Sequence, residues 1–187
     1  MSVAPAHAPV RSILLMLGAV SLFPLMDGVA KQLVASYDVL QVVWARYVFH
    51  LALISLLFLR RPPHRPGRTR NVRLQVARSA LLMTATVLFF TALRYIPLAD
   101  AVAINFTAPL LMVALSIPLL GERVGPRRWT AVGIGFLAML VIIRPGTGVF
   151  HWASFLVVGA ATCYSLYQIV TRRLSTIDDP LTTLFFS

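Results

Sequence analysis

Two ionisable side chains stand out in the first apolar stretch of the chain, because apolar stretches rarely contain charged residues unless these are paired or have a functional role. Asp27 and Lys31 are four residues apart, so a helix would place them on one face. They could form the polar wall of a path for a small solute, with Asp27 binding a proton or cation. They could equally form an interfacial ion pair that only orients their helix. The residues leave both interpretations open.

Arg46 and His50 repeat this spacing in the second apolar stretch. The guanidinium of Arg46 suits an anionic group, because its planar fork donates two parallel hydrogen bonds. The imidazole of His50 could titrate near neutral pH, or it could simply hydrogen-bond a neighbouring helix. We favour the second role for His50 and expect Arg46 to be the better candidate for ligand contact.

The fourth apolar stretch contains Asn105, Thr107 and Pro109 within five positions. Proline has no backbone N–H, so it would leave a carbonyl one turn earlier without its helical partner, and that carbonyl could line a cavity. A kink that serves packing alone is an equal alternative. These three residues are therefore candidates for the same solute path.

Tyr164, Tyr167 and Gln168 form a polar stripe at helical spacing in the sixth apolar stretch. Stripes of this kind more often hold helices together than contact a ligand. Two aromatic rings beside an amide would nevertheless suit a planar or amphipathic substrate. The stripe completes the set of candidate binding residues.

Signals for catalysis are weak. The chain has no zinc-protease, nucleophile-elbow, phosphate-loop or paired-cysteine motif, so we expect no enzyme activity, no cofactor and no metal. Gly133, Gly135 and Ala138 fit a dinucleotide fingerprint in spacing, but they lie within one apolar stretch and indicate close helix packing instead. The net charge of +11 comes from cations between apolar stretches, so we expect no nucleic acid partner.

The elements that carry these residues are predicted by hydropathy. Hydrophobic residues make up 58% of the chain and charged residues only 12%, whereas a soluble domain keeps about a quarter of its residues charged. A bilayer core needs about 20 apolar residues of helix. Six stretches qualify, namely 12–35, 39–59, 76–95, 98–120, 127–144 and 151–171. A seventh opens at Pro180 and stops at Ser187, so we expect the chain to be part of a longer protein.

The basic residues predict an orientation. With the N-terminus in the cytoplasm, the inner connections carry twelve Arg residues, and the outer ones carry only Lys31, Arg94 and Arg144. Short cytoplasmic loops of membrane proteins are enriched in Lys and Arg. We therefore expect a multi-pass protein of the plasma (inner) membrane with a cytoplasmic N-terminus.

Two segments of the chain also resemble each other in sequence. A shift of 141 positions aligns residues 15–40 with 156–181 and gives eight identical pairs, including Gly18 with Gly159 and Asp38 with Asp179. If the sixth helix repeats the first, the repeat unit has five helices, and an odd number makes the second copy enter the membrane from the opposite side. This pattern predicts an inverted repeat.

The stretch 93–146 carries a more specific pattern: Pro109 near the middle of a helix, then Gly121-Glu122-Arg123, then a glycine-bearing helix that closes on Arg144-Pro145-Gly146. In this order the parts resemble EamA-type transporters of the drug/metabolite transporter superfamily. The resemblance implies an all-α integral membrane protein, a helical bundle built from inverted five-helix repeats. Residues 1–146 would form the first repeat, and residues 147–187 would form the truncated start of the second.

These observations together predict a membrane transporter, or permease, that moves small metabolites or drugs by alternating access. Its partners would be the lipid bilayer and a small molecule whose identity the residues do not specify, and a homodimer is one assembly this allows. A small multidrug-type exporter working as an oligomer is one alternative. A membrane scaffold or fragment without flux is another.

Overall fold

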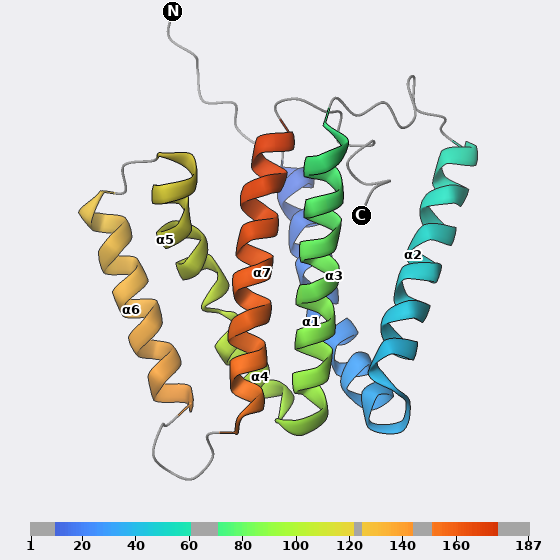
Figure 1. The fold of residues 1–187 in the computed structure, drawn as a ribbon, viewed down its shortest axis with the longest axis horizontal. Coiled ribbons are helices and arrows are strands. Elements are labelled where there is room, and N and C mark those ends of the chain that lie inside the picture. Colours follow the sequence, from blue (N-terminus) through green and yellow to red (C-terminus); the bar gives the residue numbers. More distant parts are fainter. Residues whose placement is uncertain (1–9, 61–70, 122–124, 144–150, 176–187) are drawn as a thin grey trace, which may run out of the picture.

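The computed structural model describes residues 10–60, 71–121, 125–143 and 151–175 (Figure 1). Within these ranges every regular element is an α-helix, which confirms the all-α prediction. The helices are α1 (Val10–Ser36), α2 (Val39–Arg60), α3 (Val72–Tyr95), α4 (Leu98–Asn105), α5 (Ala108–Leu120), α6 (Pro126–Ile143) and α7 (Ala153–Leu174).

The fourth predicted stretch differs from its expectation. It forms two helices, because α4 ends at Asn105 and α5 begins at Ala108. Pro109 is the second residue of α5. The N–H groups of the first turn have no partner within the helix, so the missing N–H of Pro109 costs α5 no hydrogen bond. The predicted disturbance at this proline is therefore a break between two helices.

Five stretches of the described residues are long and apolar enough to cross a membrane, and α4 with α5 counts as one of them. Several membrane-spanning helices fit a multi-pass protein. The predicted number of six spans is not confirmed, because α6 forms at the expected residues but is not among the five. The stretch predicted to open at Pro180 lies outside the described residues.

Helix ends follow local side-chain chemistry. Asp38 accepts a hydrogen bond from the backbone N–H of Leu40 at 2.8 Å, at the start of α2. Asn71 accepts from the backbone N–H of Leu74 at 3.3 Å, so α3 begins four residues before the apolar stretch predicted for it. Gly121 ends α5 with a φ of 66°, in the left-handed region, a backbone conformation that residues other than glycine rarely adopt.

The α3 and α7 helices form the centre of the bundle and make its most extensive helix contact. Figure 1 shows them side by side, with α5 and α6 on one side and α2 on the other. Gly159 of α7 allows this close approach, because a Cβ atom there would lie 3.3 Å from the side chain of Leu88. Residues about 70 positions apart in the chain are thereby brought together.

The apolar side chains of α1 are mostly exposed. Leu14 has 62% of its surface exposed and Leu17 has 59%. Such a surface would be costly in water, but it suits contact with lipid or with further apolar helices. Only the last part of α1 enters the core, where Ala30 and Val34 pack with Val43, Phe90 and other buried residues.

Candidate functional site

A cavity of about 400 Å³ lies between five helices of the bundle, and we call it the polar chamber. Each of the five helices contributes one polar side chain to its lining: Asp27 from α1, Arg46 from α2, Thr86 from α3, Asn105 from α4 and Tyr164 from α7. Polar groups within membrane-spanning segments usually face a cavity or one another, because hydrocarbon does not solvate them. The chamber is therefore the place where such groups converge.

Aromatic and aliphatic side chains form the rest of the wall. Four phenylalanines contribute, namely Phe23, Phe89, Phe90 and Phe106. A small number of polar groups set among apolar and aromatic ones is typical of small-molecule sites, where the apolar wall provides contact area and the polar groups provide orientation.

Arg46 is fixed against one of these rings. Its guanidinium carbon lies 5.5 Å from the ring centroid of Phe90, and Phe90 is only 3% exposed. A cation over an aromatic face is attracted to the ring's negative π-surface, more strongly where water is excluded. Asp27 of α1 lines the same chamber. One cationic and one anionic group thus share the chamber.

Tyr164 presents a ring and a hydroxyl to the chamber. The hydroxyl accepts a hydrogen bond from the Gln168 amide nitrogen at 2.9 Å, and the ring stacks on Tyr167 at 5.7 Å between centroids. Neither Tyr167 nor Gln168 is part of the chamber lining. The predicted stripe therefore divides into one lining residue and two residues that contact it.

The break between α4 and α5 places Asn105 at the chamber. The nitrogen of Pro109 cannot donate to the Asn105 carbonyl as a helical N–H would. The backbone around the break is held by side chains, since Thr107 donates to the Ile104 carbonyl at 2.7 Å and Ser165 of α7 donates to the Ala108 carbonyl at 2.8 Å. Thr107 is buried and Pro109 is exposed, and neither lines the chamber.

Lys31 and His50 lie away from the chamber as well. The ammonium of Lys31 donates to the carbonyls of Leu93 and Ile96, the latter at 2.9 Å, at the C-terminal end of α3. Among the described residues the buried Nε2 atom of His50 has no hydrogen-bond partner. The predicted pairs Asp27 with Lys31 and Arg46 with His50 are thus each separated, and one member of each reaches the chamber.

Two residues were not anticipated from the sequence, one in the chamber lining and one outside it. Thr86 lines the chamber, and its hydroxyl oxygen lies 3.5 Å from the hydroxyl of Tyr47. Arg78 is buried between α3 and α7 and contacts Tyr167. The signal for Arg78 was a cation inside an apolar stretch, the same feature that pointed to Asp27 and Arg46.

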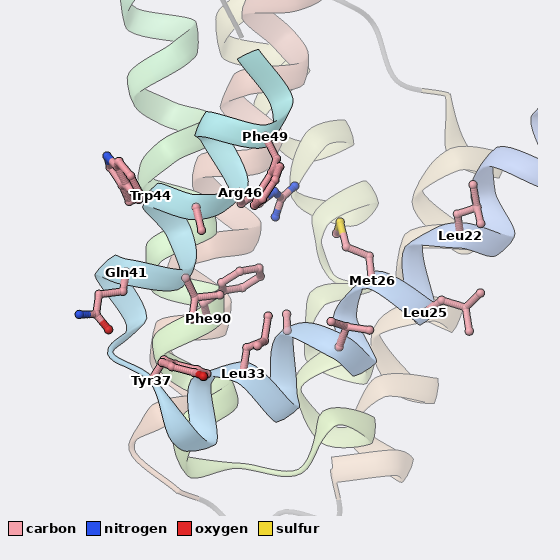
Figure 2. Close-up of a pocket in the computed structure, with 14 residues that line it drawn as sticks. Leu22, Leu25, Met26, Leu33, Tyr37, Gln41, Trp44, Arg46, Phe49 and Phe90 are labelled. Atoms are coloured by element: carbon pink, nitrogen blue, oxygen red, sulfur yellow. The ribbon is translucent and has the colours of Figure 1, made fainter. Parts of the chain in front are cut away.

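A second, larger cavity of about 900 Å³ runs along α1 and α2, and we call it the lateral groove (Figure 2). Its lining is almost entirely apolar, and it shares Met26, Arg46 and Phe90 with the polar chamber. Figure 2 shows Arg46 of α2 facing Met26 of α1 across this groove. The lateral groove has few polar groups that could orient a polar solute.

No group of three or more His, Cys, Asp or Glu side chains in the described parts of the chain is placed to hold a metal ion. The free thiol of Cys163 is half-buried and belongs to neither cavity. The lining of the chamber provides charged groups, hydrogen-bonding groups and aromatic rings.

Comparison with known proteins points to one family. Residues 10–144 match the EamA-like transporter family. A riboflavin transporter of Vibrio cholerae is 29% identical over 183 residues, covering 96% of this chain and 61% of that protein. A riboflavin transporter of Rhizobium johnstonii is 28% identical over 184 residues, covering 97% of this chain and 60% of that protein.

A more distant relative carries a different substrate name. An S-adenosylmethionine uptake transporter of Rickettsia prowazekii is 23% identical over 161 residues, covering 86% of this chain and 54% of that protein. No solved structure matches the chain. The chain spans about 60% of the length of the riboflavin transporters it matches. Because the family match covers well over half of its residues, the chain belongs to the EamA-like transporter family.

Proposed function

We propose that the protein transports a small metabolite across the membrane and that the polar chamber binds this metabolite. One observation carries the proposal: five polar side chains from five different helices converge on one cavity whose remaining wall is apolar. Helix packing alone would be served by scattered interhelical hydrogen bonds. Substrate sites of alternating-access transporters are typically found where several helices meet, one of them discontinuous.

The lining supports a planar, heteroaromatic and polyhydroxylated substrate. The rings of Phe89, Phe90 and Tyr164 offer faces for stacking. Arg46, Asp27 and Asn105 together provide donors and acceptors for ring nitrogens, carbonyls and hydroxyls. Riboflavin combines these features, and two relatives are named for it, so riboflavin is the substrate we propose to test first.

The membrane arrangement we propose is the inverted repeat. The first repeat would comprise residues 1–146 and the second would begin at residue 147, with six spans in this chain and a cytoplasmic N-terminus in the inner membrane. Figure 1 supports it, because α1 and α7 run in opposite directions, as the first helices of inverted repeats must. The positive-inside distribution of Arg supports the same orientation.

The direct test is counterflow in liposomes that contain the purified protein. Liposomes loaded with unlabelled riboflavin should take up labelled riboflavin faster than protein-free liposomes, and Arg46→Gln should slow this exchange. Exchange equal to protein-free liposomes for riboflavin and for a panel of other heteroaromatic metabolites would favour a scaffold without flux. Exchange that requires an assembled oligomer of this chain would favour the small multidrug-type exporter.

A further inference from the structure

Arg78 is the most deeply buried cation among the described residues, with 3% of its surface exposed. It lies on α3 at the contact with α7 and is not part of the lining of either cavity. A buried guanidinium is costly and is kept only where several groups receive its hydrogen bonds.

Its contacts converge on Tyr167. One terminal nitrogen of Arg78 donates to the Tyr167 hydroxyl at 3.1 Å, and the guanidinium carbon lies 4.9 Å from the centroid of the Tyr167 ring. Nε donates to the Thr171 hydroxyl at 2.9 Å, and the other terminal nitrogen reaches the Gln75 side-chain oxygen at 3.5 Å. Contact with both the face and the hydroxyl fixes the position and the tilt of the Tyr167 ring.

Tyr167 in turn supports a residue of the chamber wall. Its ring stacks on Tyr164 with an interplanar angle of 26°, and Tyr164 lines the polar chamber. Gln168 donates to the Tyr164 hydroxyl from the same helix. The Tyr164 ring is therefore held at its face by Tyr167 and at its hydroxyl by Gln168. The face contact depends on where Arg78 holds Tyr167.

We propose that Arg78 is a positioning residue for the polar chamber, which acts through Tyr167 to set the orientation of the Tyr164 ring. Its effect on transport rests on the proposed function, that is, on the chamber binding the substrate. Its effect on the orientation of Tyr164 does not. The two can therefore be measured separately.

The orientation is measured without any substrate. A fluorine-labelled tyrosine placed only at position 164 reports its surroundings by fluorine NMR in lipid nanodiscs. The parent protein should give one narrow resonance. Arg78→Lys should shift and broaden it, because an ammonium cannot contact the Tyr167 ring face and also hydrogen-bond both the Tyr167 and the Thr171 hydroxyls. Tyr167→Phe, which keeps the ring, should give a smaller change in the same direction.

Thr162→Val is the matched control, because Thr162 lies on the same helix and its hydroxyl donates to a backbone carbonyl of that helix, that of Val158, at 2.8 Å. Its spectrum should match that of the parent. If Arg78→Lys does not fold, Tyr167→Phe alone decides. A parent-like resonance in the folded variants, or several resonances in the parent itself, overturns the proposal.

The second measurement is labelled-riboflavin uptake into proteoliposomes. Arg78→Lys and Tyr167→Phe should each raise KM about three- to tenfold while changing the maximal rate less than about twofold, and neither should have a further effect in a Tyr164→Leu background. Independent, additive effects would contradict action through Tyr164. Absence of riboflavin uptake in the parent would refute the proposed substrate and leave the NMR result to decide on Arg78.

Discussion

The guanidinium of Arg46 lies over the ring of Phe90, and this pair borders both the polar chamber and the lateral groove. The cation of Arg46 within a membrane-spanning helix is thereby stabilised by an aromatic face. The same pair lines both a cavity with five polar side chains and a groove with an almost entirely apolar wall.

Replacing the ring tests the Arg46–Phe90 pair. Phe90→Leu removes the aromatic face, so Arg46 loses an attraction worth about 0.5 to 2 kcal/mol and becomes less well placed. We expect the inhibition constant of riboflavin phosphate against labelled riboflavin to rise about two- to thirtyfold. Phe136→Leu is the control, because Phe136 is exposed on α6 and lines neither cavity. Equal effects of the two substitutions would mean that the pair has no special role.

Removing the Arg46 charge tests its preference for anions. In Arg46→Gln, competition by riboflavin phosphate against labelled riboflavin should weaken about tenfold or more, because a charge-assisted hydrogen bond contributes about 1.5 to 3 kcal/mol. Competition by unlabelled neutral riboflavin should weaken much less. The inhibition constants of the two competitors provide the measurement. Equal weakening of both would show that Arg46 does not contact the anionic group.

Asp27 is expected to couple transport to a cation gradient. Asp27→Asn should abolish riboflavin accumulation driven by an imposed pH gradient while leaving counterflow exchange largely intact, because exchange needs no net charge movement. Asp38→Asn is a matched control, since Asp38 caps α2 at the exposed end and asparagine caps equally well. Unchanged accumulation and unchanged pH dependence in Asp27→Asn would exclude proton coupling through this residue.

Lys31 is expected to matter for stability. Its ammonium satisfies two carbonyls at the end of α3, so Lys31→Met should lower the free energy of unfolding by about 1 to 3 kcal/mol with little change in KM. Gln32→Met changes the exposed neighbouring position and should leave unfolding unaffected. Denaturant titration in detergent gives the first quantity and counterflow the second. A large rise in KM at an unchanged free energy of unfolding would indicate that Lys31 contacts the solute.

Hydropathy and charge identified part of this site for a physical reason. Ionisable residues inside apolar stretches are rare because they are expensive, so Asp27 and Arg46 stood out. Lys31 and His50, each four residues further along the chain, do not line the chamber. A helix rises about 6 Å over four residues, which places Lys31 and His50 one turn further along the membrane than the residues with which they share a face.

Other parts of the site depend on packing between distant segments. Thr86 is one of several threonines on α3, and nothing local shows which of them faces the cavity. The position of Tyr167 is set by Arg78, which lies 89 residues earlier in the chain. The helices and a disturbance at Pro109 could be predicted, because apolar length and a missing N–H are local properties. That this disturbance divides the stretch into α4 and α5 was not predicted.

Substrate protection of single thiols tests the central claim most directly, namely that the polar chamber binds the substrate. In a Cys163→Ser background, Asn105→Cys places a thiol in the chamber, and Met112→Cys places one on the next helix outside both cavities. Saturating riboflavin should slow maleimide labelling severalfold at position 105 and leave position 112 unchanged. Labelling at position 105 that is insensitive to riboflavin, in protein that still exchanges it, would contradict the assignment of the chamber as the binding site.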